Sequence, residues 1–506
     1  MASPSAKLIG IDVGTSGCKT IVIDAQGRVL ARHLVEYPLS TPKPGWAEQD
    51  PDLWWQAALD GLRAVVGEIG DRSSILAIGL SGQMHGLVPL DRDDRVIRPA
   101  ILWNDQRTAA QCRAITEAAG GLDGLLAMTN NQMLIGYTGS KITWLRDEEP
   151  AHFERLRCVI NPKDHIRLEL TGEKATDVSD ASGTGLFDVR NRRWSFELID
   201  RIGLDRSLFQ RAHESHAVTG RLRPSLSAEL GLPAGLPVMA GGGDAVIQTT
   251  GSGLIEPGIV QSIIGTAGIA ATALADCPDN PDGRLQIFCN NSPDRWHCMG
   301  VSMNAGGAFN WLRNTLSAFA GRKLDFNALT ALAEDVAPGA EGLFFLPWLL
   351  GERCPHPDPN ARGGFVGLTL RHGPGEIIRA AMEGVVYSMR DMFELMRPLG
   401  VDPREVRASG GGAASLLWRQ MQADIIGAEV VTVAGAAEGG AYGAALVAGV
   451  GAGVWSDLES ACAMVEVETR LVPDTARKPA YDAAYGIYHD FYERLKPQFD
   501  RIAEMG

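Results

Sequence analysis

The sequence lacks a net positive charge. Its 47 Lys and Arg residues are outnumbered by 61 Asp and Glu residues, which gives a formal net charge of −14 at pH 7. Proteins that bind nucleic acids usually carry a basic face, so this balance argues against a nucleic-acid partner. An anionic ligand would have to be held by local backbone N–H groups and a cation, because the overall field repels it.

Paired cysteines and long apolar runs are also lacking. The 8 cysteines contain no C-x-x-C pair and no zinc-type spacing, so we expect reduced thiols in a cytoplasmic protein. No secretory apolar segment precedes the first expected strand, which favours the same location. The apolar stretch 439–455 is shorter than a membrane span and is built mostly from Gly and Ala. It predicts a closely packed internal helix, and no membrane partner is expected.

The length of 506 residues exceeds what one hydrophobic core usually supports. Strand-like and helix-like patterns alternate along the chain, which predicts an α/β fold with two domains. We place these domains at residues 1–240 and 241–506, with the Pro- and Gly-containing stretch 232–237 as the junction. A helix is expected over 51–66, with Asp50 as its N-cap, and the segment 354–364 is expected to be an exposed loop.

One short pattern appears twice, about half the chain apart. The stretches LIGIDVGTSGCKTIVID and IVQSIIGTAGIAATAL each place Gly-Thr-small-Gly between two apolar runs. Such a repeat indicates a duplicated architecture, and a tight Gly-Thr turn offers N–H groups and a hydroxyl to a phosphate. We predict phosphate contacts at Thr15, Ser16, Gly265 and Thr266. The alternative for each turn is an ordinary hairpin without a ligand.

The two copies differ just before the turn. Asp12 precedes the first turn, and Ile263 occupies the matching position in the second. A carboxylate at a strand end suits Mg²⁺, which keeps most of its waters and takes one or two protein carboxylates. We therefore predict that Asp12 holds the metal. The sequence GCKT resembles the end of a P-loop, but the required Gly-Lys pair is absent and a strand follows it.

A second acidic residue follows three glycines at the end of an apolar strand. In VMAGGGDAV, Asp244 stands at the start of an expected helix, where the helix dipole favours an ionised carboxylate. A positioned, ionised Asp is what a general base for an alcohol needs. The alternative is an ordinary helix N-cap, the commonest role of Asp at such a place.

Candidate sugar-binding side chains follow two other strands. Met84 and His85 lie in SGQMHG, and Trp103 lies in ILWNDQR. Open α/β sheets commonly bind ligands at such strand ends, and a Trp ring offers a flat face to the C–H groups of a sugar. The alternatives are a structural histidine and a half-buried core tryptophan.

A glycine turn precedes another helix in SGGGAASLLWRQMQAD. The match to a dinucleotide fingerprint is poor, because the acidic residue expected about 20 positions later is missing. A glycine surface for adenine or ribose is the better interpretation, with Gly411 and Ser415 as the candidate residues.

Taken together, these stretches resemble the FGGY carbohydrate kinases nearly from end to end. The matching segments include IGIDVGTSG, GLSGQMHGLV, RPAILWNDQR, GYTGSKITWLRDE, NPKDHIRLELTGE, AGGGDA, IGTAG, FLPWLLGERCPHPDPNARGGFVGL and SGGGAASLLWRQMQADI. QMHG and WND are similar to the subgroup that acts on xylulose, as distinct from glycerol kinase.

The resemblance implies two actin-like (ribonuclease-H-like) ATPase domains with ATP and sugar in the cleft between them. It implies ATP- and Mg²⁺-dependent phosphorylation of D-xylulose at its terminal hydroxyl, giving D-xylulose 5-phosphate and ADP. By the same resemblance Asp244 is the catalytic base and also touches the sugar, beside Met84, His85 and Trp103. Asp12, Thr15 and Ser16 fall on the metal and phosphate turn, Gly265 and Thr266 on the opposing turn, and Gly411 and Ser415 beside adenosine. A homodimer is expected from the family alone.

One position departs from the subgroup. Its members typically read GGGDN, whereas this chain has Ala245 after the Asp. Losing a polar contact in a sugar pocket can change discrimination between substrates by orders of magnitude. A kinase for ribulose, an L-pentulose or a polyol therefore stays open as an alternative. An actin-like, ATP-switched binding protein and a nicotinamide-dependent dehydrogenase are the rivals from other classes.

Overall fold

The computed structural model describes residues 5–505, which form two compact units. Unit 1 contains the chain up to Ile255, together with Ala275–His297 and Ala434–Glu466. Unit 2 contains Glu256–Leu274, Cys298–Val433 and the chain from Val467 onward. Two later segments thus return to unit 1, which local sequence patterns did not indicate.

The expected junction at residues 232–237 lies inside unit 1. It leads into the strand Pro237–Met239, which pairs with a central strand of the unit 1 sheet. Its Pro and Gly residues mark a connection from a helix to a strand within one unit. Pro and Gly favour such a turn just as they favour a junction between domains, so they do not distinguish the two. Asp244, which we placed in the C-terminal domain, also belongs to unit 1. The boundary between residues 240 and 241 stays a prediction.

The central sheet of unit 1 has the strand order β13–β14–β5–β1–β2–β3, and β15 also pairs with β5. β1, β2 and β3 are joined by antiparallel hairpins, whereas β5 runs parallel to β1 and β14 parallel to β5. The strands are β1 (Lys7–Val13), β2 (Gly17–Asp24), β3 (Val29–Glu36), β5 (Ile75–Gly82), β13 (Val218–Arg221), β14 (Pro237–Met239) and β15 (Gly242–Gly243).

The helices of unit 1 begin as the sequence predicts where caps are present. The expected helix at 51–66 is α1, in which the Asp50 side chain accepts from the Asp52 N–H and Pro51 occupies the first turn. The helices are α1 (Pro51–Glu68), α2 (Ala109–Ala118), α3 (Leu122–Thr129), α4 (Thr138–Glu148), α5 (Pro150–Arg155), α6 (Pro162–Thr171), α7 (Val178–Ser182), α8 (Phe196–Arg201), α9 (Pro224–Leu230), α10 (Asp244–Gly251), α15 (Gly439–Gly451) and α16 (Leu458–Cys462).

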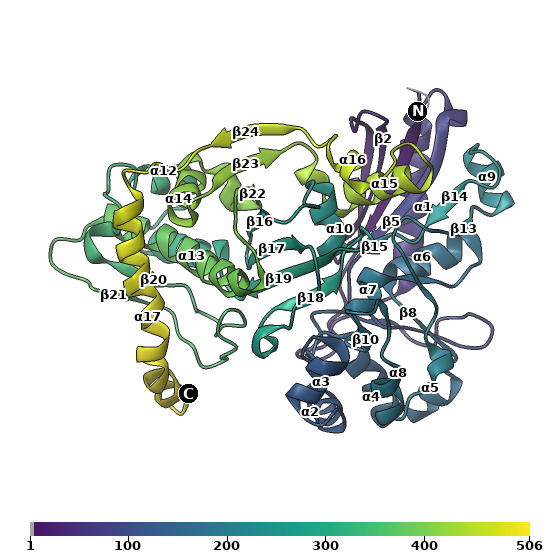
Figure 1. Ribbon diagram of the computed structural model, residues 1–506, viewed down its shortest axis with the longest axis horizontal. Helices are drawn as coiled ribbons and strands as arrows, with labels where there is room; N and C mark the ends of the chain where they lie inside the picture. Colours follow the sequence, from purple (N-terminus) through teal and green to yellow (C-terminus); the bar gives the residue numbers. More distant parts are fainter. Residues whose placement is uncertain (1–4, 506) are drawn as a thin grey trace. The chain divides into compact units, whose positions relative to one another are not determined.

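α15 packs directly on β1, β5 and α10 (Figure 1). A Cβ atom on Gly10 would lie 1.9 Å from the Ala441 carbonyl oxygen, and one on Gly79 would lie 1.8 Å from that of Ala444. Any side chain at either glycine would push the helix off the sheet. The prediction of a closely packed internal helix is confirmed, and no helix of residues 5–505 has the length and apolarity that a membrane crossing requires.

The part of the second seven-stranded sheet that lies in unit 2 repeats this plan, with the strand order β19–β17–β16–β22–β23–β24. β16 and β17 form an antiparallel hairpin, β22 runs parallel to β16, and β23 runs parallel to β22. The strands are β16 (Ile259–Ile264), β17 (Gly268–Leu274), β19 (Trp296–Ser302), β22 (Glu405–Ser409), β23 (Glu429–Val433) and β24 (Val467–Leu471). The helices are α11 (Gly306–Ala320), α12 (Phe326–Ala331), α13 (Pro374–Met396), α14 (Leu416–Ile426) and α17 (Lys478–Ala503).

The remaining strands are short. β18 (Gln286–Cys289) belongs to unit 1. The others form two-stranded pairs, which are β4 (Glu48–Gln49) with β7 (Ala100–Ile101), β6 (Val88–Leu90) with β8 (Cys158–Ile160), β9 (Thr176–Asp177) with β12 (Ala212–His213), β10 (Phe187–Asp188) with β11 (Arg193–Trp194), and β20 (Phe344–Leu346) with β21 (Gly364–Val366).

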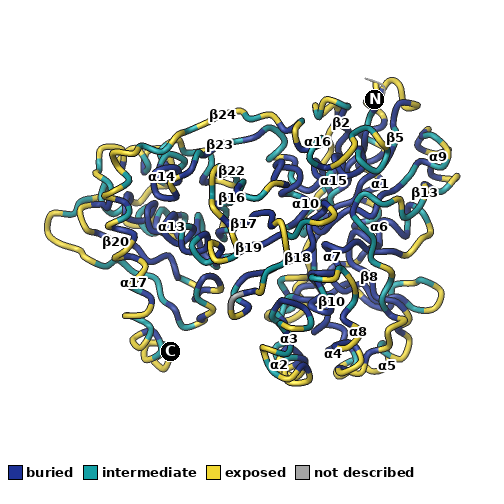
Figure 2. Tube along the Cα trace, in the orientation of Figure 1, coloured by how far each residue is buried: buried dark blue, intermediate teal, exposed yellow. Residues whose placement is uncertain are grey.

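Each unit has its own apolar core, and the most buried segments in Figure 2 include the central strands and the helices against them. The expectation of an exposed loop at 354–364 is wrong in one respect. The segment is a loop, but Cys354, Asp358 and Ala361 are buried. Its Pro and Gly residues predicted irregular backbone correctly, and they carry no information on exposure.

Candidate active site

The parallel pairing of β1 and β5 brings Asp12 beside Ser81. The two residues are register partners, and the Ser81 hydroxyl donates to Asp12 Oδ1 at 2.6 Å. Removal from water raises the pKa of Asp12, although the Ser81 hydrogen bond opposes this shift. The N-terminal end of α15 also reaches this point, because a Cβ on Gly440 would lie 2.7 Å from Asp12 Oδ1. Glycine is needed at position 440 for the helix to approach the carboxylate.

The first Gly-Thr turn follows Asp12. The Gly14 N–H donates to the Gly17 carbonyl at 3.0 Å and closes the hairpin. The Thr15 hydroxyl accepts from the Trp103 indole N–H at 2.9 Å and donates to Gln83 Oε1 at 3.3 Å. Ser16 is exposed at the tip of the turn. Thr15 and Trp103, which we assigned to phosphate and sugar, therefore touch each other.

Asp244 is the first residue of α10, and Gly243 is the N-cap. Asp244 Oδ1 accepts from the Ala245 N–H at 2.7 Å and from the Met84 N–H at 3.3 Å. Burial and, second, the negative charge of Asp12 raise the pKa of Asp244 to about 7. The helix dipole alone predicted an ionised carboxylate, but here removal from water and a like charge outweigh it. A carboxyl that titrates near neutral pH is well matched to a general base.

The neighbouring carboxylates of Asp12 and Asp244 also bear on metal binding. Within residues 5–505 no group of three or more His, Cys, Asp or Glu side chains is arranged to hold an ion. Mg²⁺ does not need such a group, since it uses one or two carboxylates and completes its shell with water and phosphate oxygens. The donor set therefore fits a hydrated Mg²⁺ at Asp12, whose charge would offset the repulsion between the two carboxylates.

Met84 and His85 lie directly after β5. Met84 is buried, and Cβ atoms on Gly183 and Gly243 would lie 2.7 Å and 2.4 Å from its side chain. His85 has a positive φ of 67°, a conformation that costs a residue other than glycine ~1–3 kcal/mol. Its Nδ1 lies 2.5 Å from the Gly183 carbonyl, which can only accept, so Nδ1 carries the proton.

Trp103 is 44% exposed, unlike the other candidate sugar residues. Four residues after the end of β7, the Asp105 carboxylate accepts from the Ala47 N–H at 2.7 Å and pairs with Arg107 at 2.6 Å. This buried pair fixes the loop that carries the indole ring. The half-exposed ring with its anchored loop favours ligand contact over a core role.

A buried ionic cluster is connected to the backbone next to Asp244. Lys163 Nζ lies 2.6 Å from Asp164, 3.0 Å from Asp177 and 3.2 Å from Asp180, and all four side chains are fully buried. Asp177 accepts from the Ser179 N–H at 2.7 Å and from its hydroxyl, and Ser179 Oγ in turn accepts from the Gly243 N–H at 3.0 Å. This chain of contacts fixes the backbone immediately before the proposed base.

The other four predicted residues lie in unit 2. The Gly265 N–H donates to the Ala267 carbonyl at 3.1 Å, and the Thr266 carbonyl accepts from the Ala305 and Gly307 N–H groups at 2.9 and 3.1 Å. Gly411 begins a short 3₁₀ turn, and a Cβ on the preceding Gly410 would lie 2.8 Å from the Ile264 carbonyl oxygen. Ser415 caps α14 by accepting from the Trp418 N–H at 3.3 Å. The second Gly-Thr turn and the glycine turn are thus adjacent, and their ligand contacts stay predictions.

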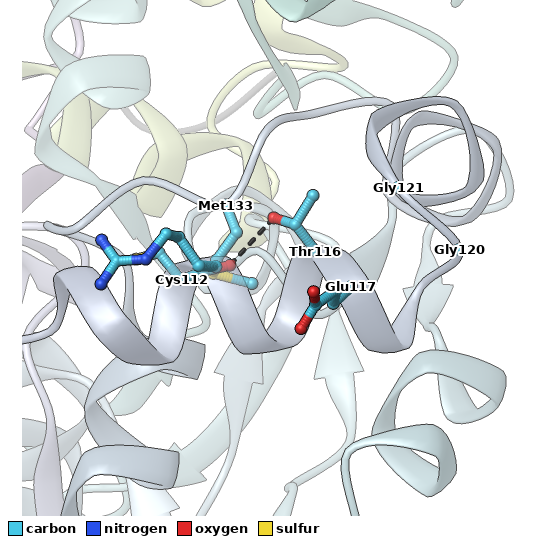
Figure 3. Close-up of a pocket in the computed structure, with 7 residues that line it drawn as sticks. Cys112, Thr116, Glu117, Gly120, Gly121 and Met133 are labelled. Atoms are coloured by element: carbon cyan, nitrogen blue, oxygen red, sulfur yellow. Dashed lines mark hydrogen bonds between the residues drawn. The ribbon is translucent and has the colours of Figure 1, made fainter.

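A separate pocket opens beside α2 in unit 1 (Figure 3). Its volume is about 550 Å³, and its lining includes Cys112, Thr116, Glu117 and Met133. The dashed line in Figure 3 is the hydrogen bond from the Thr116 hydroxyl to the Cys112 carbonyl, at 2.9 Å. None of the predicted site residues lines this pocket. Its position gives it no part in the chemistry above.

Sequence reasoning missed Ser81, Gln83 and Ser179. Ser81 and Gln83 belong to the SGQMHG stretch, and polar residues at the end of an apolar strand were an available signal. Ser179 had no such signal, since it reaches Asp244 through the backbone of a residue distant in sequence.

Comparison with known proteins gives two matches to one family. Residues 7–251 match the FGGY family of carbohydrate kinases, N-terminal domain, and residues 260–452 match its C-terminal domain. The chain is 37% identical to a xylulose kinase of Escherichia coli over 97% of this chain and 99% of that protein. It is 36% identical to a xylulose kinase of Bacillus subtilis over 97% of both chains.

Solved structures agree with these sequence matches. A xylulose kinase from Rhodospirillum rubrum is 31% identical, with a TM-score of 0.91 over 98% of this chain and 100% of that chain. The predicted α/β fold with two actin-like domains is confirmed by this likeness and by the repeated sheet order of the two units.

Proposed function

The chain belongs to the FGGY family of carbohydrate kinases, and from this membership we propose that it phosphorylates D-xylulose. The reaction transfers the γ-phosphoryl group of ATP to the terminal hydroxyl of the sugar and gives D-xylulose 5-phosphate and ADP. Relatives named xylulose kinases, which match nearly the whole chain at 34–37% identity, support this substrate.

The observation that carries the proposal is the setting of Asp244. Two backbone N–H groups donate to Oδ1, so the carboxyl is oriented, and its pKa of about 7 allows it to gain and lose a proton at neutral pH. Oδ2 then accepts the proton of the terminal sugar hydroxyl while that oxygen attacks the γ-phosphorus. The new O–P bond forms as the bond from phosphorus to the β,γ-bridging oxygen breaks, and ADP leaves with that electron pair.

Asp12 would hold a Mg²⁺ ion, which supplies neutralisation of the charge on the phosphate oxygens. Ser81 fixes the carboxylate of Asp12 by its 2.6 Å hydrogen bond, so the ligand is oriented before the ion binds. Thr15 and Ser16 in unit 1, and Gly265 and Thr266 in unit 2, are the proposed contacts to phosphate. Gly411 and Ser415 are the proposed contacts on the adenosine side.

Met84, His85 and Trp103 are the proposed sugar contacts. The Trp103 ring offers a face to C–H groups, and the His85 imidazole is a polar group that can hydrogen-bond a hydroxyl. Ala245 follows Asp244 and offers no side-chain polar group at the position where the resemblance led us to expect an amide. Because this polar group is missing, other pentuloses and polyols should be tested as alternative substrates.

The decisive experiment is an ADP-release assay over D-xylulose, D-ribulose, L-xylulose, L-ribulose and glycerol. We expect the highest kcat/KM for D-xylulose, by at least about tenfold over glycerol, since polar contacts built for one sugar reject analogues that lack them. A tenfold preference for another sugar would replace the proposed substrate and leave the kinase chemistry standing. ATP turnover that no carbohydrate changes would instead revive an ATP-switched binding protein.

We also propose that the enzyme works in the cytoplasm, where ATP is supplied, and that it forms a homodimer. Fractionation of cells and light scattering of the purified protein test these two proposals separately.

A further inference from the structure

Lys141 is a buried cation that the proposed mechanism does not use. It lies in the first turn of α4 and its side chain is fully buried. Within residues 5–505 no carboxylate lies within salt-bridge distance of its Nζ. Both burial and the positive end of a helix dipole disfavour an ammonium group, so this residue needs an explanation.

Lys163, another buried lysine of unit 1, shows how a buried ammonium group is usually stabilised. Lys163 is surrounded by three carboxylates, which raise its pKa although burial opposes them. For Lys141, burial dominates and lowers the pKa to about 7, and Asp105 compensates only in part. Lys141 therefore occupies an electrostatically unfavourable site, whereas Lys163 is stabilised by its partners.

The partners of Lys141 are two backbone carbonyls. Its Nζ donates to the His85 oxygen and to the Gly136 oxygen, both at 2.6 Å. Such charge-assisted hydrogen bonds are stronger than neutral ones. One carbonyl belongs to His85, a predicted sugar residue, and the other belongs to a turn that contacts Trp103.

His85 needs such support because of its backbone. Its positive φ of 67° is a conformation that L side chains rarely adopt. The ring stacks on Tyr137, with centroids 4.6 Å apart and planes 27° apart, and Tyr137 precedes α4. Lys141 thus fixes the backbone of His85, while the residue before its own helix supports the ring.

Gly136 connects the same lysine to Trp103. A Cβ on Gly136 would lie 2.6 Å from the Trp103 carbonyl oxygen, so the two backbones are in close contact. The hydrogen bond from Lys141 holds the Gly136 turn at this distance. One ammonium group therefore connects the turns that carry His85 and Trp103.

We infer that Lys141 is a positioning residue for the sugar, which holds His85 and the Trp103–Gly136 contact in the geometry that recognises a polyhydroxylated ligand. This inference rests on the proposed function, because it takes His85 and Trp103 as sugar contacts. Lys141 touches neither the reacting atoms nor the residues assigned to phosphate.

Lys141→Met tests this role, since it keeps an unbranched side chain only one heavy atom shorter and removes the donors. We expect the Kd of D-xylulose, measured by calorimetry without nucleotide, and its KM to rise at least tenfold. The KM of ATP should stay within about twofold, because none of the contacts of Lys141 involves the phosphate turns. An unchanged sugar Kd, or an equal rise in both KM values, would overturn the inference.

Thr143→Val is the matched control. Thr143 lies on the same helix and is buried, and among residues 5–505 its hydroxyl bonds only to the Gly139 and Ser140 carbonyls within α4. We expect its sugar Kd within twofold of the wild type. If Thr143→Val weakened sugar binding as much as Lys141→Met, general loosening of α4 would explain the effect and the inference would fail.

A second variant covers the case in which Lys141→Met does not fold. Lys141→Gln removes the charge, whose burial is unfavourable, and keeps an N–H₂ donor, so we expect it to fold and to raise the sugar Kd at least threefold. A folded Lys141→Gln with wild-type sugar affinity would contradict the inference. If the wild type itself prefers another sugar, the proposed substrate is wrong, and the same variants are then measured with that sugar.

Discussion

The hairpins β1–β2 and β16–β17 have the same neighbouring strands in their sheets, but they differ in the residues before the turn. Each is followed in its sheet by a parallel strand, then by another, then by an antiparallel edge strand. Two positions before the Gly-Thr turn, unit 1 has Asp12 and unit 2 has Ile263. Four positions before it, the register pair is Gly10 with Gly79 in unit 1 and Gln261 with Arg407 in unit 2.

These differences show how a duplicated frame acquires separate tasks. The glycine pair lets α15 contact the sheet backbone, and the same helix brings its N-terminal end to Asp12. Unit 2 carries bulky polar side chains at the corresponding pair, where such an approach is not available. The two carboxylates with proposed roles in catalysis, Asp12 and Asp244, both lie in unit 1.

The largest effect is expected from Asp244→Asn. Removing the base should lower kcat about 10³-fold, within the range that general-base catalysis supplies, while D-xylulose affinity changes less than threefold. The measurement is ADP release at saturating substrates, with calorimetric sugar binding as the control. A near-normal turnover would show that Asp244 is not the base. The proposed difference between the units, in which unit 1 carries both catalytic carboxylates, would then fail.

The same variant should be more stable than the wild type at pH 8 without metal. The folded pKa of about 7 lies above the ordinary value of 3.8, so the favourable contribution is complete below 3.8 and is lost as pH rises to about 7. At pH 8 the ionised carboxyl opposes folding, and Asn removes that cost. We expect a higher unfolding temperature by calorimetry at pH 8 and a smaller difference at pH 4.

The next effect tests the acidic position of the hairpin itself. Asp12→Asn should lower kcat by about 10²-fold at saturating Mg²⁺, because a ligand of the ion is lost. The corresponding change in unit 2, Ile263→Val, should leave kcat within about twofold. Equal losses at both positions, measured by ADP release, would show that the two hairpins are not specialised in this way.

Gly79→Ala tests the close approach of α15. The added Cβ would meet the Ala444 carbonyl oxygen at 1.8 Å, so we expect a loss of about 3 kcal/mol in the free energy of unfolding. Gly67→Ala is the control, since Gly67 sits on α1 and, apart from its chain neighbours and its own helix backbone, no described atom lies within 4 Å of its added Cβ. That change should stabilise by roughly 0.5–1 kcal/mol. Denaturant unfolding measures both, and a neutral Gly79→Ala would contradict the packing argument.

The smallest effect, taken over a single pH unit, is the pH dependence of the wild type. Because Asp244 must be ionised to accept a proton, kcat/KM for D-xylulose should fall about tenfold for each pH unit below about 7. The Kd of ATP, measured over the same range, separates this loss from weaker nucleotide binding. A profile that stays flat down to pH 5 would show that the base is already ionised there.

Local patterns predicted a large part of the fold. The two hairpins, the Asp50 cap of α1 and the helix start at Asp244 follow from turn, cap and periodicity signals that lie within a few residues. The return of α15 to unit 1 was not predictable in this way. It depends on Gly10 and Gly79 matching Ala441 and Ala444, which lie more than 350 positions later in the chain.

The candidate site divides along the same line. Some site residues were predictable from their residue type at a strand end, namely Asp12, Met84, His85, Trp103 and Asp244. Unit 1 brings them together through Ser81, Gln83 and backbone contacts. Ser179 and Lys141 act on backbone groups of distant residues. No residue-type signal encodes such contacts, because any backbone offers the same N–H and carbonyl groups.

The glycine-lined seat for α15 has a consequence for synthesis of the chain. The strands with Asp12 and Ser81 emerge early, but the helix that packs on them begins at Gly439, well after Ile255. At about 5–20 residues per second, roughly 20–70 s of translation separate the end of β5 from the start of α15. Throughout that interval the nascent sheet presents bare Gly10 and Gly79 to solvent or to a chaperone. The carboxylate of Asp12 therefore reaches its final surroundings only after α15 has been synthesised.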